Sequence, residues 1–154
     1  MEKNPTEKHL FVVVGKSNCG KTTVVKKINK LCYNFLIKKG FTQTNVKTHQ
    51  GQDIAYRYTN VATDEKVGIF SHGDSYHIID KYYKLLQDCP IVICASRHSK
   101  PQFTAIREII KKPKRTLHIL YKTGKPKLDM EEDDNWVVEQ FKEKIKKLPL
   151  FADL

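Results

Sequence analysis

The sequence predicts an α/β protein built as a three-layer sandwich, with helices on both faces of a mostly parallel sheet. Residues 10–14 and 90–95 are almost wholly apolar, and apolar runs of this length are typical of strands buried on both faces. Stretches with apolar residues at helical spacing alternate with the strand-like segments. This alternation favours helices packed on a central sheet.

The composition indicates a soluble globular chain. Its 154 residues are enough for one well-cored domain, so we expect a single domain over 1–154 with a flexible leader over 1–8. No apolar run approaches about 18 residues, which argues against a membrane span, and the polar start does not resemble a signal peptide. The four cysteines lack C-x-x-C spacing, so we expect free thiols and a cytoplasmic protein.

The charge is strongly positive, at +11, and unevenly distributed. No Asp or Glu occurs from Lys8 to Gln52, and Glu108 is the only acid from Arg97 to Lys127. Such a field favours polyanions, so nucleic acid is a candidate partner. The alternative is a lysine-rich solvated surface, since only four of the 28 basic residues are Arg, the residue that base-reading sites favour.

The first strand, at about 9–14, leads into a glycine-containing loop and then a helix over about 21–38 that stops at Gly40. The loop fits the pattern G-x-x-x-x-G-K-S/T at every fixed position. We expect its residues, and the Thr that follows, to bind a nucleotide phosphate: Gly15, Lys16, Ser17, Asn18, Cys19, Gly20, Lys21, Thr22 and Thr23.

This order of residues suits phosphate chemistry. Successive backbone N–H groups and the helix N-terminus wrap an anion, and the two glycines let the backbone approach it. Lys21 would neutralise the β- and γ-phosphates as a catalytic cation, and the Thr22 hydroxyl would ligate Mg²⁺. On these residues the sequence resembles the P-loop NTPases. As a whole-chain pattern it resembles small prokaryotic ATP-binding P-loop proteins more than a named kinase family.

Residues 41–53 show no clear period, and two roles are open for them: a functional loop near the phosphates or second substrate, or a plain surface loop. Residues 54–59 and 66–70 suit strands. The segment between them is too short for a crossover helix, which predicts an antiparallel hairpin. This hairpin resembles the GTPase-like branch of the superfamily.

In P-loop proteins a carboxylate near such a strand end commonly holds Mg²⁺ through water. Here Ser71 stands directly after the strand, and Asp74 comes three residues later. Asp74 is therefore a candidate catalytic and metal-holding residue, with capping of the following helix, whose apolar residues run from Ile78 to Leu86, as the alternative. Ser71 should face the same crevice.

The strand at 90–95 should lie beside strand one and parallel to it, so that its carboxyl end opens on the phosphate loop. Arg97 falls at that end. We expect it to stabilise charge on a transferring phosphoryl group, the alternative being a surface Arg.

The rest of the chain completes the layers. A third helix should begin near Pro101, a fifth strand should span 116–121, and a basic loop should follow over 122–127. The acidic run 129–134 precedes the last helix, as a helix start prefers. The total is five strands and four helices, with the strand order 2-3-1-4-5 and strand two antiparallel.

The end of the fifth strand bears on nucleotide choice. GTP-specific relatives carry Asn/Thr-Lys-x-Asp there, and this chain keeps only Lys122 of it. ATP is therefore expected over GTP, with Mg²⁺. Three functions remain open: an ATP-dependent NTPase or small kinase, a nucleotide-dependent switch that binds a protein, and a nucleic-acid-associated protein. A kinase needs an acceptor base, for which Asp53 and Asp74 are the nearby candidates.

Overall fold

The computed structural model describes residues 7–15, 21–47, 51, 53–72, 76–97, 100–111, 114–122 and 130–154, with the backbone alone at 76, 97, 100–103, 130 and 131. Six strands form one mixed sheet in the order β2-β3-β4-β5-β1-β6. Their bounds are β1 His9–Gly15, β2 Thr42–Asn45, β3 Ala55–Thr59, β4 Lys66–Phe70, β5 Ile91–Arg97 and β6 Thr116–Tyr121.

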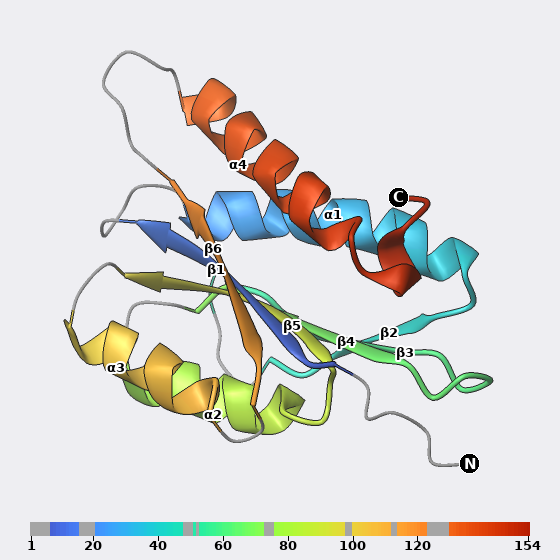
Figure 1. Ribbon diagram of the computed structural model, residues 1–154, viewed down its shortest axis with the longest axis horizontal. Helices are drawn as coiled ribbons and strands as arrows, with labels where there is room; N and C mark the ends of the chain where they lie inside the picture. Colours follow the sequence, from blue (N-terminus) through green and yellow to red (C-terminus); the bar gives the residue numbers. More distant parts are fainter. Residues whose placement is uncertain are drawn as a thin grey trace.

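Helices cover both faces of this sheet (Figure 1). The helices α1 (Lys21–Lys38) and α4 (Met130–Ile145) pack on one face, and α2 (Tyr76–Leu86) and α3 (Lys100–Ile109) pack on the other. A short 3-10 helix, η1 (Pro149–Phe151), follows α4. The three layers predicted from the sequence are therefore confirmed. No helix in the described ranges is long and apolar enough to cross a membrane.

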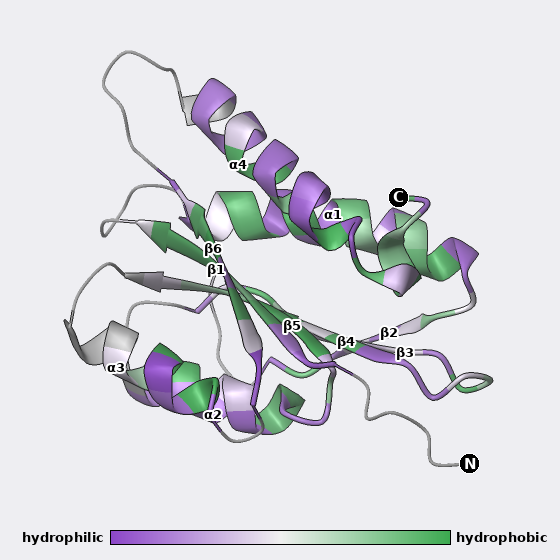
Figure 2. Cartoon of the chain, viewed as in Figure 1, coloured by the Kyte–Doolittle hydropathy of each residue, from purple (hydrophilic) through white to green (hydrophobic). Residues whose placement is uncertain are grey.

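Strand β1 divides the core into two halves. Phe11 and Val13 belong to the cluster under α1 and α4, whereas Leu10, Val12 and Val14 belong to the cluster under α2 and α3. Alternating side chains point to opposite faces of a strand, so a continuous apolar run serves both layers. Figure 2 shows hydrophobic colour along β1, between the two helix layers, and mainly hydrophilic residues on α4.

The predicted strand count and order are wrong. The missed strand, β2, is polar and mostly exposed, so it carries no hydrophobic alternation. It pairs antiparallel with β3, and the side chain of Gln43 donates to the Tyr58 hydroxyl at 2.8 Å. That hydroxyl donates in turn to Asn29 on α1 at 2.6 Å, which ties the edge of the sheet to the helix.

The order differs because β5 lies between β4 and β1. β5 pairs parallel with β1, as predicted, but its other edge pairs with β4 through residues 91–93 and 67–69. Strands apolar on both faces can occupy several central places, so hydrophobicity alone does not settle which neighbours they take. The hairpin of β3 and β4 is antiparallel, as predicted, but the predicted strand order is not found.

The first helix ends as the sequence predicts. α1 stops at Lys38, and Gly40 adopts a φ of 89°. The N–H of Phe41 donates to the carbonyl of Leu36 at 3.0 Å and that of Gly40 to Ile37 at 3.1 Å, which closes the last turn. A positive φ is accessible to glycine at little steric cost, so Gly40 redirects the chain into β2.

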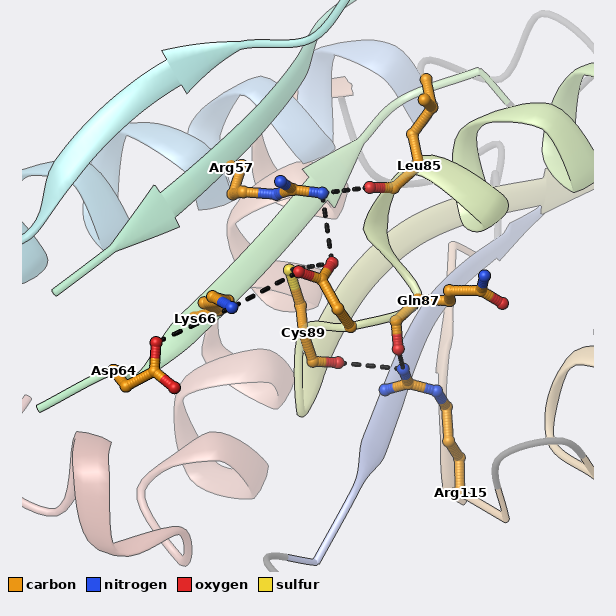
Figure 3. Close-up of polar contacts among 8 residues, drawn as sticks. Arg57, Asp64, Lys66, Leu85, Gln87, Cys89 and Arg115 are labelled. Atoms are coloured by element: carbon orange, nitrogen blue, oxygen red, sulfur yellow. Dashed lines mark hydrogen bonds and ion pairs between the residues drawn. The ribbon is translucent and has the colours of Figure 1, made fainter. Parts of the chain in front are cut away.

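Arg115 holds the amino end of the sheet together from a buried position. Its guanidinium donates to the carbonyls of Gln87 and Cys89, both at 2.9 Å, as drawn in Figure 3. It also donates to the carbonyls of His9 and Pro90, both at 3.2 Å, and to the hydroxyl of Tyr83 at 2.8 Å. Arg115 therefore closes the turn between α2 and β5 onto β1.

Candidate nucleotide-binding site

The carboxyl ends of the central strands meet at one edge of the sheet. Gly15, the last residue of β1, is the register partner of Arg97, the last residue of β5. On the other side of β1, the N–H of Lys122 donates to the carbonyl of Val14 at 2.9 Å just after β6 ends. Ligands of open α/β sheets bind beyond this edge, so the edge that carries Gly15 is the expected crevice.

The helix α1 begins at Lys21, directly after the glycine-containing loop. Lys21 is only 6% exposed, and Thr22 is half-buried. The predicted phosphate-binding residues Lys16, Ser17, Asn18, Cys19 and Gly20 lie outside the part of the chain that the structure describes. What it does describe is the context that the motif requires, a buried strand before the loop and a helix N-terminus after it.

Asp53 connects the start of α1 to the far side of the crevice. Its Oδ1 accepts a hydrogen bond from the Thr22 hydroxyl at 3.0 Å and another from the Ser71 hydroxyl at 2.8 Å. Its Oδ2 lies 3.7 Å from Nε2 of His72. About a third of the Asp53 side chain, 36%, stays exposed, so the carboxylate can still meet a ligand or an ion in the crevice.

The hairpin explains how Asp53 reaches this edge. Because β3 runs antiparallel to β4, the start of β3 lies beside the end of β4. Two hydrogen bonds lock the junction: Ile54 N–H donates to the Ser71 hydroxyl at 2.8 Å, and Ser71 N–H donates to the Ile54 carbonyl at 2.9 Å. Ser71 thus faces the crevice as predicted, and it orients a carboxylate supplied by the neighbouring strand.

His72 also contributes to the position of Asp53. It is 8% exposed, and its ring stacks on Tyr82 with the centroids 4.4 Å apart. Stacking restricts the imidazole, so Nε2 keeps its place near Asp53. The contact of His72 with Asp53 depends on α2, which supplies Tyr82 behind the imidazole ring.

Sequence reasoning placed the carboxylate at Asp74, which lies outside the described ranges, and considered Asp53 only as an acceptor base. A signal for Asp53 was nevertheless present. It is the first acid after Glu7, and it stands directly before a strand whose predicted hairpin partner ends at Ser71. Pairing the two strands in the predicted hairpin would have placed Asp53 beside Ser71.

Lys122 marks the β6 side of the crevice. Its ammonium is buried between Asp133, at 2.9 Å, and Asp134. Burial opposes the charge, but hydrogen bonds to Asp134 and Asp133 hold the pKa of Lys122 above its ordinary value. The acidic run therefore differs from its predicted place, because α4 begins at Met130 and both carboxylates lie inside the helix, where they anchor β6.

The fold and this edge together define a P-loop NTPase-type protein: a buried strand, the glycine-containing motif, a helix that begins at its Lys, and a carboxylate hydrogen-bonded to its Thr. A family model described as "NTPase" matches residues 10–111, more than half of the chain. The chain belongs to this NTPase family, and the predicted relationship to P-loop NTPases is confirmed.

One solved structure shows a weak overall similarity to this chain. The crystal structure of APE1195 aligns with 99% of this chain and 76% of that chain, at 16% sequence identity and a TM-score of 0.42. No curated protein matches the chain.

Proposed function

We propose that this protein is a Mg²⁺-dependent ATPase or phosphoryl-transfer enzyme that uses Lys21, Thr22 and Asp53 at the phosphates. Family membership supports nucleotide binding and NTPase activity. The observation that carries the finer proposal is the pair of hydrogen bonds that join Asp53 to Thr22 and Ser71. A hydroxyl and a carboxylate held together at the start of the phosphate-binding helix are the groups that a P-loop enzyme needs there.

The donor set fits magnesium. Mg²⁺ takes oxygen ligands and usually binds through one or two carboxylates together with phosphate oxygens and waters. Thr22 offers a hydroxyl, and Asp53 offers an oxygen-only side chain that is partly exposed. Among the described residues, no group of three or more His, Cys, Asp or Glu side chains is arranged to hold a metal ion. A magnesium site that is completed by phosphate oxygens does not need such a group. When bound, the ion would neutralise charge on the β- and γ-phosphates.

The chain's own residues would do the rest of the work. Lys21 places a cation at the N-terminus of α1, where backbone N–H groups also favour anions. Ser71 and His72 hold Asp53 in one orientation. Arg97 has its backbone beside Gly15, so its guanidinium is proposed to act on the charge that develops in the transition state. Asp74 keeps its proposed role as a second carboxylate near this edge.

ATP is the proposed nucleotide, with GTP as the alternative. The end of β6 lacks the carboxylate that reads guanine in GTP-specific relatives, and the Lys122 ammonium is engaged by Asp133 and Asp134. A competition titration should show ATP displacing GTP at lower concentration than the reverse. Stoichiometric displacement of ATP by GTP would assign the protein to GTP.

Nucleic-acid association is a second candidate, supported by the charge of +11 and by exposed lysines along α1 such as Lys30 and Lys38. It predicts DNA or RNA binding that weakens steeply with salt and survives Lys21→Ala. A nucleotide-dependent switch would instead show slow hydrolysis with tight nucleotide binding. DNA and RNA binding measured at two salt concentrations distinguishes a nucleic-acid-binding protein from the enzyme and from the switch.

The deciding experiment follows the label from γ-labelled ATP in the presence of Mg²⁺, with and without nucleosides, nucleotides and oligonucleotides. Lys21→Ala and Thr22→Ala should abolish turnover and the thermal stabilisation by Mg·ATP while the fold persists. Lys30→Ala, an exposed change on the same helix, is the matched control and should behave as wild type. Unchanged stabilisation by Mg·ATP in Lys21→Ala would contradict the proposal.

A further inference from the structure

A second cavity lies next to Asp53. It has a volume of about 440 Å³ and opens between α1, the end of β2 and the start of β3. This volume is within the range of small-molecule sites. The side chains that carry the argument are those of Lys26, Asn45, Lys47, Asp53 and Tyr56.

The cavity adjoins the proposed phosphate site through Asp53 and is separate from the place of the nucleotide base. Lys26 lies one helical turn after Thr22, and residues four apart share one face of a helix. Asp53 contacts Thr22 and also lines the cavity. In the sheet, β2 and β3 lie at the opposite side from β6, whose end reads the base in nucleotide-binding relatives of this kind. A molecule in the cavity would therefore be a second ligand.

The polar groups in the cavity favour an anion. Lys26 is half-buried and has no carboxylate partner among the residues described. Lys47 donates to the carbonyl of Gly51, and an ammonium carries two more donors, for which the described residues show no partner. The Asn45 side chain accepts the Lys47 N–H through its oxygen at 2.8 Å, which leaves its amide NH₂ as a donor. The two ammonium groups outnumber the one carboxylate, and the oxygens of Asp53 already accept from Thr22 and Ser71.

Tyr56 adds an aromatic surface to the same cavity. It is half-buried, and its ring packs against the core under α1. A ring fixed in this way offers a planar group a surface at low entropic cost. We propose that this cavity binds a second small molecule, an anion carrying a phosphate or carboxylate together with a planar ring, beside the triphosphate of the bound nucleotide. Only its placement beside the triphosphate rests on the proposed function.

The test measures binding by calorimetry in protein saturated with Mg²⁺ and a non-hydrolysable ATP analogue, so that the phosphate loop is already occupied. The probes are AMP, benzoate, adenosine and inorganic phosphate. AMP binding identifies a phosphate ligand, benzoate binding identifies a carboxylate ligand, and adenosine tests whether the ring suffices without charge. We expect one equivalent of AMP or benzoate to bind, and adenosine and inorganic phosphate to bind much more weakly.

Lys26→Ala and Lys47→Ala should each weaken that binding by about tenfold, as the loss of a charge-assisted contact does. The matched controls, Lys30→Ala and Lys38→Ala, change exposed lysines of the same helix that do not line the cavity, and they should leave the affinity unchanged. The proposal is overturned if the protein binds neither AMP nor benzoate. It is also overturned if the control variants weaken the binding as much as Lys26→Ala does.

The same variants separate this proposal from the proposed function. Thermal stabilisation by the Mg·ATP analogue reports the phosphate site and should persist in Lys26→Ala and Lys47→Ala. If the analogue fails to stabilise the wild-type protein, the probe titration is repeated without it in wild type and in Lys21→Ala. If probe binding survives Lys21→Ala and is lost in Lys26→Ala, the proposed cavity ligand is supported although the proposed phosphate site is wrong. Any other result overturns the proposal that the cavity binds a ligand.

Discussion

Replacing Asp53 by Asn tests the proposed catalytic role most directly, because it removes a charge and preserves the shape. Asn keeps an oxygen that can accept from the Thr22 and Ser71 hydroxyls, which donate to Asp53 at 3.0 Å and 2.8 Å. Hydrogen bonds to a charged group contribute about 1.5–3 kcal/mol and neutral ones about 0.5–1.5 kcal/mol. Two such bonds therefore lose about 2–3 kcal/mol before solvent screening, and less in practice because Asp53 is 36% exposed.

The effect on activity should be much larger than the effect on stability. Loss of one preorganised charged contact typically lowers kcat by about 10²–10³-fold, or about 3–4 kcal/mol in activation free energy. We expect Asp53→Asn to fold, to lose turnover on this scale, and to need more Mg²⁺ for half-maximal activity. The assays are urea unfolding, steady-state release of phosphate, and a Mg²⁺ titration at fixed ATP.

Asp64→Asn is the matched control for Asp53→Asn. Asp64 lies in the β3–β4 turn at a φ of 60°, a conformation that Asn also tolerates, and it is exposed. The control should retain wild-type turnover and Mg²⁺ dependence. If Asp53→Asn also retains both, Asp53 is a structural acceptor for the two hydroxyls, and the proposed metal-holding role is wrong.

Three further outcomes are expected. Arg97→Ala should leave ATP affinity nearly intact and lower turnover by about 10²–10³-fold, so normal turnover would make it a surface charge. Arg115→Lys should lower the free energy of unfolding by roughly 3–5 kcal/mol, because an ammonium cannot satisfy the five acceptors that the buried guanidinium contacts; urea unfolding against the exposed control Arg107→Lys measures this. The ring nitrogens of His9 and His118 lie 3.0 Å apart, and burial lowers the pKa of both imidazoles. As the pH falls below about 6.5, these two residues therefore bind protons in the unfolded chain before they do so in the folded protein. Stability from this pair should be full above that pH and decline below it, and urea midpoints should show a shallower decline in His118→Phe but an unchanged one in His77→Gln.

Local pattern was enough to predict the part of the site that is contiguous in the sequence. The phosphate-binding motif, the strand before it and the helix after it are set by neighbouring residues, and so is the stop at Gly40. The antiparallel hairpin also followed from the sequence, because a segment of six residues between two strands leaves no room for a crossover helix. The parallel pairing of β1 and β5 was also predicted, and in the structure it brings Arg97 opposite Gly15.

Tertiary structure decided which segments meet. Strands β4 and β5 are both suited to a buried position, and their apolar residues do not say which of them adjoins β1. Tight packing is visible at Gly68 of β4, where an added Cβ would lie 3.0 Å from Leu86 on α2. Asp53 joins Thr22 only because the hairpin carries the start of β3 to the end of β4. Residues 31 positions apart contact each other there. The spacing of apolar residues shows which face of a segment is buried. Which segment packs against that face depends on how all the described strands and helices fill the core together.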